Sequence, residues 1–454
     1  MTSHIQTSPT STPATVTGPR RRTGRVIAAS LATGLISALL LVTAPFVPAQ
    51  EDGVMGAVLI GFAVGWAMMA VLTTRLTAAP QRWAIAPAVF MGLGGLLLVT
   101  FGPAARTVLD WVWPPAMLAL TIWMILRVRR MPSRGGRRLL YPVVVFLALA
   151  ALGAGYETAA EAVDARAQLM PGQLVDVGGH RLHLNCTGSG SPTVVLEPGA
   201  GAMAANLGWI TPAVARSTRV CTYDRAGRGW SEPADGPQDG VQIAADLHTL
   251  LRSAGVPGPY VLAGHSFGGL YVLAFADRYP DEVAGMVLID STAPAAPGTS
   301  AAGDRRGEPE AVRRISALTS AAARFGVVRV FTQLSYRDMP PRSRDELRAG
   351  GATASTLRST IDEYAQGSAS VREAAAMQDF GQKPLVILTA GAGHDATWAT
   401  AQDRLARLST NAAHRIIDGA AHEDLVADRR YAAISAQAVV DVVTSVRTAQ
   451  PLPH

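Results

Sequence analysis

The chain has 454 residues, a length that favours more than one folded unit. Hydrophobic residues make up 49% of it and charged residues only 16%, a composition that leans toward a membrane protein. The net charge of +6 would suit an acidic partner. However, many arginines stand beside apolar runs, and no DNA-reading motif or aromatic-interleaved basic stripe is present, so nucleic-acid binding is not expected.

The N-terminal third is predicted to be a membrane region. Residues 1–25 are rich in Ser, Thr and Pro and end in a cluster of arginines, so they are expected to form a disordered tail. Five apolar runs follow within residues 26–156: Val26–Val47, Val54–Leu72, Trp83–Phe101, Val108–Leu126 and Leu139–Gly155. Because a membrane helix needs about 17–25 apolar residues, these runs predict five transmembrane helices.

The distribution of arginines predicts the orientation of these spans. Arginines gather before the first run, between the second and third runs, and densely at 127–138 between the fourth and fifth, while the other loops hold few or none. This alternation places the N-terminus in the cytoplasm and everything after about Tyr156 outside it, in a multi-pass protein of the cell membrane. A cleaved signal peptide in place of the first run stays open and leaves that orientation unchanged. No charged residue lies in the middle of a span, so the sequence gives transport no support.

A linker is expected at 157–171. After it, the sequence changes from long apolar runs to short strand-like runs that alternate with helical segments. Residues 172–448 begin with two short strands around a Gly-Gly turn and continue with buried-looking runs such as TVVLE, YVLAG, GMVLID and PLVILTA. Helical periodicity follows most of these runs, which predicts a mostly parallel sheet with helices on both faces. Residues 291–383 break the alternation and are predicted to be a cap or lid inserted between two strands.

The stretch LAGHSFGGLYV is predicted to carry a nucleophile. Gly264 and Gly268 flank Ser266 in the pattern Gly-x-Ser-x-Gly, in which the serine occupies a strained turn between a strand and a helix. The apolar run before this motif and the helical segment after it supply the required context. A serine hydroxyl also needs a base to remove its proton and donors to stabilise the oxyanion.

The predicted base is His422, one of nine histidines. It follows the last expected strand in IIDGAAHEDL, so it comes last in chain order, as it does in enzymes with a nucleophile elbow. The remaining histidines lie in the tails, in the early hairpin, on a helix or at the start of a strand. His265 adjoins the serine but is expected to point elsewhere, and His394 belongs to a glycine-rich loop.

From about Gly172 to Val446 the chain resembles an α/β-hydrolase, in particular the membrane-anchored actinobacterial type. The resemblance rests on HSFGG, YDRAGRGWS, RYPDEVAGMVLID, the late GAAH, LNCTG and VCTYD, and it does not include the five apolar runs. It implies the α/β-hydrolase fold with no metal and no organic cofactor. It also implies an oxyanion hole formed by the backbone amides of Phe267 and Ala200, although Pro198 stands where many relatives have a histidine.

Two aspartates compete for the role of the acid that orients His422. Asp290 ends the strand GMVLID, a position that some members of the family use. Asp395 follows the next strand in LTAGAGHD, close to the position that most members use, but its loop is about one residue longer than the usual pattern. Asp290 is preferred because the end of a strand holds it firmly, and Asp395 stays open as the alternative. Asp224 is expected to belong to a structural turn.

The only two cysteines, Cys186 and Cys221, both fall on the expected extracytoplasmic side. They lie on strands that are neighbours in the fold that the resemblance implies, and oxidising surroundings permit a disulfide between them. The alternative is a pair of buried thiols that act as small hydrophobic residues.

The function expected from these features is that of a membrane-anchored, extracytoplasmic serine hydrolase that cleaves carboxylic esters through an acyl-enzyme. Its expected partners are a small-molecule or lipid ester and the lipid bilayer. Because a fold does not fix a function, several alternatives remain open. They are amidase, thioesterase, peptidase or cofactor-free peroxidase activity, and a non-catalytic receptor or sensor. The substrate and the oligomeric state cannot be read from the sequence.

Overall fold

The computed structural model describes residues 19–294 and 310–453. The chain folds into two compact units. The first runs through Leu152, and the second comprises everything from Gly153 onward together with residues 49–51.

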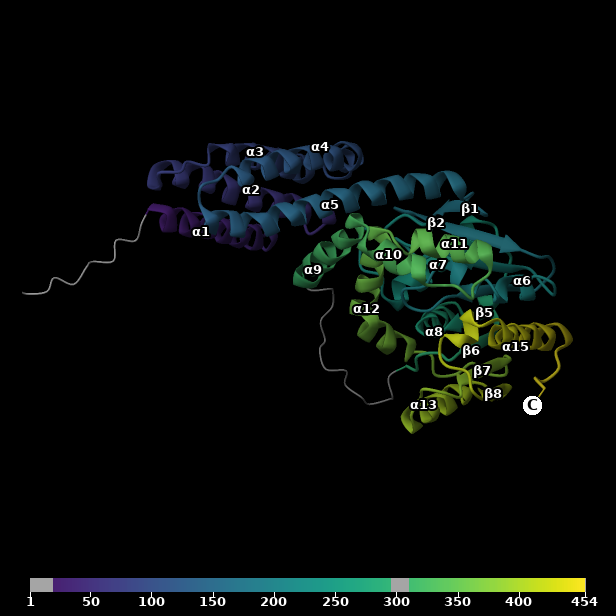
Figure 1. Cartoon of the computed structure of the whole chain (residues 1–454). Helices are drawn as coiled ribbons and strands as arrows, with labels where there is room; N and C mark the ends of the chain where they lie inside the picture. The colour runs from purple at the N-terminus through teal and green to yellow at the C-terminus, as the bar shows by residue number, and fades with distance from the viewer. Residues whose placement is uncertain (1–18, 295–309, 454) are drawn as a thin grey trace, which may run out of the picture. The chain divides into compact units, whose positions relative to one another are not determined.

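The N-terminal unit is built from long helices (Figure 1). They are α1 (Pro19–Val42), α2 (Glu51–Leu76), α3 (Ile85–Phe101), which follows the short η1 (Arg82–Ala84), α4 (Pro103–Arg129) and the first part of α5 (Arg134–Ala167). Five helical segments of the described chain are long and apolar enough to cross a membrane, so the prediction of five such helices is confirmed. Small residues let α1 and α2 approach closely, because a Cβ on Gly61 would lie 2.3 Å from the Cα of Ala38.

Two of the predicted boundaries differ from the structure. Helix α1 begins at Pro19, inside the tail expected at 1–25, because proline suits the first turn of a helix and the arginines that follow are good helix formers. Helix α5 continues to Ala167 through most of the linker expected at 157–171. The segment TAAEAVDARA consists largely of strong helix formers, and Pro171 and Gly172 are the first breakers after it.

The C-terminal unit contains an eight-stranded sheet with the spatial order β1-β2-β4-β3-β5-β6-β7-β8. The strands are β1 (Gln173–Asp176), β2 (Arg181–Thr187), β3 (Thr193–Glu197), β4 (Val220–Tyr223), β5 (Tyr260–His265), β6 (Val283–Ile289), β7 (Leu385–Ala390) and β8 (Ala412–Ile417). Strand β2 is antiparallel to both of its neighbours, and all the other pairs are parallel.

Helices cover both faces of this sheet. Helices α7 (Gly240–Ser253) and α8 (Gly268–Arg278) pack on one face, and α6 (Ile210–Val214) and α15 (Arg429–Thr448) pack on the other. Successive strand residues point to opposite faces, so Val195 and Leu262 join one core while Val194 and Val261 join the other. The central strands are therefore apolar throughout, and the predicted mostly parallel, two-sided sheet is confirmed.

The antiparallel edge of the sheet holds the two cysteines. Cys186 on β2 lies opposite Cys221 on β4, and the structure joins them in a disulfide. The bond crosses between adjacent strands within one sheet.

The insertion between β6 and β7, expected at 291–383, is helical where the structure describes it. It contains α9 (Glu310–Ser320), η4 (Ala321–Phe325), α10 (Val327–Leu334), α11 (Pro341–Gly350) and α12 (Ala354–Ala374). Figure 1 shows this group of helices in green beside the sheet. This insertion is called the cap below, and its helix α12 packs against α7 and α8.

Candidate active site

Ser266 occupies the sharp turn between β5 and α8. Its φ is 54°, in the left-handed region that non-glycine residues rarely adopt. The flanking glycines make the turn possible, because a Cβ on Gly264 would lie 2.5 Å from the carbonyl oxygen of Gly268, and a Cβ on Gly268 would lie 2.5 Å from that of Glu197. The turn is anchored by the Ser266 amide, which donates to the Ile289 carbonyl at 3.1 Å. The motif therefore holds the serine at the end of a central strand.

His422 and Asp290 meet at the same edge of the sheet. His422 lies in the loop after β8, and its Nδ1 is 2.6 Å from Oδ2 of Asp290, which directly follows β6. Asp290 is fully buried and has a φ of 42°. Ser266 and His422 both line one pocket of about 690 Å³. Residues from three separate loops thus converge, because parallel strands end on the same side of a sheet.

The competing aspartates have other partners. Asp395 is the N-cap of α13 (Ala396–Ala406), where its carboxylate accepts the Trp398 amide at 2.9 Å. Asp224 accepts hydrogen bonds from the amides of Ala204 and Trp230 and pairs with the buried His183. The geometry accordingly places Asp290 beside His422 and gives Asp395 and Asp224 structural contacts.

Asp290 accepts four hydrogen bonds, two on each carboxylate oxygen. His422 Nδ1 and His394 Nε2 both lie 2.6 Å from Oδ2, while the Trp398 indole and the Ala390 amide donate to Oδ1 at 3.0 and 3.1 Å. The rings of His394 and Trp398 are stacked, with centroids 4.5 Å apart. The sequence predicted only that His394 lies in a glycine-rich loop, and it did not predict that this histidine contacts Asp290. The available signal was the spacing HDATW, which puts the histidine and the tryptophan four residues apart around a helix cap.

These contacts set the protonation of the pair. Burial by itself would raise the pKa of Asp290, but the hydrogen bonds from His422, Trp398, Ala390 and His394 outweigh it and hold that pKa below its usual range. Burial would likewise lower the pKa of His422, but the hydrogen bond and the charge of Asp290 outweigh it and raise that pKa. The aspartate therefore stays ionised and stabilises the imidazolium that a general base becomes.

His265, next to the nucleophile, supports the backbone of the His422 loop. Its Nε2 lies 3.2 Å from the His422 carbonyl oxygen, and the two rings are 4.6 Å apart. Burial, with a further contribution from His422, lowers the pKa of His265 to about 4. The ring is neutral at neutral pH and adds no competing positive charge.

Two backbone amides are available to stabilise an oxyanion. Within the described residues, the amides of Phe267 and Ala200 donate to no other protein group. Phe267 caps the N-terminus of α8, where the helix dipole favours negative charge. The loop that carries Ala200 lies against the nucleophile, because a Cβ on Gly199 would be 3.1 Å from that of Ser266. This arrangement has the form of an oxyanion hole.

A buried network of charges holds the loop that carries Ala200. Arg225 pairs with Glu197 and donates to the carbonyls of Pro198 and Gly199 at 2.8 and 2.6 Å. On the other side, Glu363 of the cap helix α12 accepts the Gly201 amide at 2.8 Å. The same carboxylate pairs with Arg225 and Arg228 and accepts the Tyr271 hydroxyl. The cap thus reaches the oxyanion loop through one fully buried glutamate.

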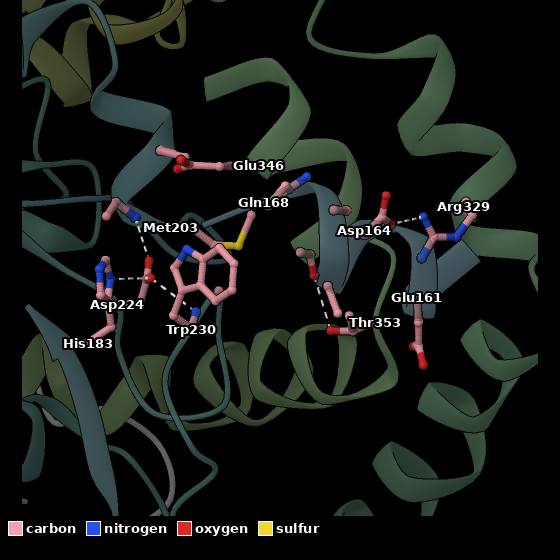
Figure 2. A pocket seen from close by; sticks show the side chains of 16 residues that line it. Glu161, Asp164, Gln168, His183, Met203, Asp224, Trp230, Arg329, Glu346 and Thr353 are labelled. Carbon is pink, nitrogen blue, oxygen red and sulfur yellow. Dashed lines mark hydrogen bonds and ion pairs between the residues drawn. The ribbon is translucent and has the colours of Figure 1, made fainter. Parts of the chain in front are cut away.

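A second cavity, of about 310 Å³, is separate from the pocket that contains Ser266 and His422 (Figure 2). The last turns of α5 line one side of it, and the pair His183–Asp224 with Trp230 lines another. Neither Ser266 nor His422 contributes to its wall.

Asp290, His394 and His422 also form a group that offers three metal-ligand atoms within 4.8 Å of one another. Ligands of one tetrahedral zinc ion, each about 2.0–2.1 Å from the metal, stand roughly 3.3 Å apart. The two nitrogens lie only 2.6 Å from Oδ2 of Asp290, which is a hydrogen-bond distance. The spacing fits proton-sharing groups better than a metal site.

A family model described as the alpha/beta hydrolase fold matches residues 192–427, which is more than half of the chain. The chain belongs to the α/β hydrolase family. In this hydrolase the matched region runs from β3 to the helix after His422, and it includes Ser266, Asp290 and His422.

Curated relatives match shorter segments. An uncharacterized protein of Schizosaccharomyces pombe is 36% identical over 152 residues, 27% of this hydrolase and 28% of the relative. The 2-hydroxy-6-oxo-2,4-heptadienoate hydrolase of Pseudomonas putida is 33% identical over 121 residues, 26% and 44% of the two chains. An uncharacterized vacuolar membrane protein of Saccharomyces cerevisiae is 34% identical over 74 residues, which are 16% of this hydrolase and 12% of the relative. Each match spans less than half of the relative's own length.

Solved structures that are similar to part of this chain have low sequence identity to it. The enol-lactonase from Burkholderia xenovorans is 20% identical with a TM-score of 0.45, covering 60% of this hydrolase and 100% of that chain. A thermophilic esterase from Thermogutta terrifontis is 20% identical with a TM-score of 0.44, covering 59% and 94%.

Proposed function

We propose that this α/β hydrolase is a membrane-anchored serine hydrolase, with its active site outside the cytoplasm, that cleaves carboxylic esters through an acyl-enzyme. The observation that carries the proposal is the strained turn that presents Ser266 to the same pocket as His422, whose Nδ1 is bound to Asp290. Epoxide hydrolases of this fold use a carboxylate as the nucleophile, so a serine at this turn argues against epoxide hydrolysis.

In the proposed reaction, Oγ of Ser266 attacks the ester carbonyl while Nε2 of His422 takes its proton. The amides of Phe267 and Ala200 bind the oxygen that becomes negative. His422 then gives the proton to the leaving alcohol, and a water molecule activated by the same histidine hydrolyses the acyl-enzyme. Asp290 holds the tautomer that keeps Nε2 free to accept the proton.

The anchoring part of the proposal is supported by the five apolar helices and by the alternation of basic and basic-poor loops. A relative that is a vacuolar membrane protein agrees with it. The disulfide agrees with an oxidising, extracytoplasmic setting for the second unit.

A fluorophosphonate probe tests the chemistry and the sidedness together. We expect the full-length wild-type protein to be labelled, Ser266→Ala to be unlabelled, and Ser335→Ala, which changes an exposed serine of the cap, to be labelled like wild type. Ser266→Ala is also expected to lower kcat on an ester by about 10⁶-fold. Labelling of intact cells by a membrane-impermeant probe tests the location. Equal labelling of Ser266→Ala, or labelling only after lysis, would contradict the corresponding half of the proposal.

Paired substrates test the reaction class. An ester and the amide of the same acyl group are given to the purified protein, and we expect the ester to be cleaved with the higher kcat/KM. Faster cleavage of the amide would replace esterase with amidase activity.

A further inference from the structure

Helices α9 and α10 of the cap have their faces inverted with respect to an ordinary surface helix. In α10, Arg329 and Thr332 are buried while the apolar residues at spacing i, i+3, i+4 and i+7 are exposed. In α9, the serines Ser316 and Ser320 are fully buried. The exposed large apolar residues of the two helices, called here the cap face, are Ile315, Leu318, Val327, Val330, Phe331 and Leu334. A surface helix normally turns its apolar stripe toward the core.

Charged residues border the cap face rather than interrupt it: Glu310, Arg337 and Asp338 are exposed beside it, and Arg313 and Arg324 are half-buried. The other exposed positions between residues 311 and 335 carry Ala, Thr, Gln and Ser. Within this unit, exposed large apolar residues outside the cap and α5 are scattered singly, for example Ile416 on β8. Exposed apolar residues gathered on one face and rimmed by polar residues mark a site of contact with a protein or a membrane.

The inward polar residues fix α10 against α5. Arg329 is 2% exposed and forms two hydrogen bonds with Glu157, at 2.8 and 2.9 Å, and one with Asp164 at 2.6 Å. Figure 2 shows the guanidinium of Arg329 turned toward Asp164. Removing one partner of such a buried pair leaves an uncompensated buried charge, so this orientation of α10 is firmly held.

The contact between cap and α5 begins where the apolar part of α5 ends. A Cβ on Gly153 would lie 2.2 Å from the Phe325 carbonyl oxygen, so backbone touches backbone there. Gly153 lies in the last turn of the apolar run Leu139–Gly155 of α5, which belongs to a candidate span with a mean hydropathy of 2.0. Tyr156, one turn further, is half exposed at 53%, and tyrosine is enriched where a span meets the membrane surface. Phe325, two residues before Val327 of the cap face, is therefore in backbone contact with Gly153 of α5.

We propose that the cap face lies in the boundary layer of the same bilayer, and that the catalytic pocket takes its ester substrates from that bilayer. The part about substrates rests on the proposed function, whereas the part about the bilayer requires only that α5 spans the membrane. Inverted faces are stable when the outside solvent is lipid, because apolar residues then need no protein cover and polar ones need partners inside.

The cap connects this face to the catalytic pocket. Helix α9 is bound to α12 through the Ser316 hydroxyl, which donates to Asp362 at 2.6 Å. Two residues away, Thr360 and Tyr364 of the same α12 line the pocket that contains Ser266. One helical insertion thus carries both the lipid-contact surface and part of the pocket wall.

The first test measures contact with lipid. The full-length protein has no free cysteine, so Phe331→Cys can carry a single environment-sensitive fluorophore in proteoliposomes. Ile416→Cys is the matched control, because its side chain is similarly exposed, at 61% against 67% for Phe331. We expect spin-labelled phosphatidylcholine to quench the probe at 331 and not the probe at 416. Equal quenching at both positions, or none at 331, would overturn the proposal.

The second test separates lipid contact from catalysis. Val330→Asp with Phe331→Asp introduces charge on exposed positions, so folding and fluorophosphonate labelling should persist. We expect kcat/KM for a water-soluble short-chain ester to stay within about twofold of wild type, and that for a long-chain ester in the vesicles to fall about tenfold. An equal fall for both esters, or no fall for the vesicle-bound ester, would overturn the substrate part. Failure of the wild type to hydrolyse either ester would count against the proposed function and leave the quenching result to decide the surface.

The alternative occupant is a second copy of the chain. If the probe at 331 stays unquenched and the protein is a dimer that the double Asp variant makes monomeric, the cap face is a subunit interface and the bilayer proposal is wrong.

Discussion

The catalytic end of the sheet and the cap insertion use buried polar groups in opposite ways. At the catalytic end, Asp290 is surrounded by four donors, and the apolar residues of the strands point into the protein core. In the cap, Arg329 and Ser316 point inward, and Phe331 and Ile315 point outward. The inward-facing groups named here have partners in both regions: four donors surround Asp290, Arg329 pairs with Glu157 and Asp164, and Ser316 donates to Asp362. The difference is what the apolar residues face, and it distinguishes a site built for chemistry from a surface built for contact.

The largest effect is expected at the catalytic end, from the two aspartates that the sequence could not separate. Asp290→Asn should lower kcat by about 10⁴-fold, because the amide no longer holds the correct tautomer of His422. Asp395→Asn keeps a capping side chain for α13 and should lower kcat less than about threefold. Ester hydrolysis by the two variants, with labelling as a check of folding, measures this. A larger loss from Asp395→Asn would reverse the assignment of the acid.

Glu363 of the cap helix α12 connects the cap to the oxyanion loop at the catalytic end, so its substitution should affect the stability of the cap and the rate of catalysis. Glu363→Gln leaves Arg228 buried without a charged partner and weakens the hold on the loop of Ala200, so we expect a loss of about 3 kcal/mol in stability and a lower kcat. Glu373→Gln on the same helix is the control, because Glu373 is only half buried. The temperature at which fluorophosphonate labelling is lost reports stability. Equal behaviour of the two variants would mean that the cap does not support the oxyanion loop.

The smallest effect is expected from His394, the second histidine on Asp290. His394→Ala should lower kcat/KM about tenfold, because one hydrogen bond to a buried carboxylate is lost. Since His422 must be neutral to act as a base, kcat/KM falls as the pH drops through its pKa. Without the hydrogen bond from position 394, the Asp290 carboxylate is more basic and the pKa of His422 rises further. The acidic limb of the plot of kcat/KM against pH therefore moves to higher pH.

The control for His394 keeps an N–H donor at that position. His394→Gln should leave the acidic limb close to that of the wild type. A limb that does not move in His394→Ala, or that moves equally in both variants, would show that His394 only fills space.

Local patterns predicted much of the fold. The apolar runs gave the five long helices and the parallel strands, because burial on both faces requires continuous apolar sequence. The spacing of Gly264, Ser266 and Gly268 predicted the elbow, since its steric demand lies within five residues. The boundaries were less certain: α5 runs past Tyr156 to Ala167, because helix propensity does not stop where hydropathy does.

By itself, then, the sequence determined the kind of chain: apolar helices, a two-sided sheet, and a serine in a turn where larger neighbours do not fit. Only the tertiary structure decided which side chains meet. Asp290 and His422 are 132 residues apart, as Glu363 and Gly201 are 162 apart, and such contacts depend on strand order and on how the cap packs. The inverted faces of α9 and α10 belong to this second class as well. An amphipathic pattern shows that a helix has two faces, but only packing shows which of them is turned inward.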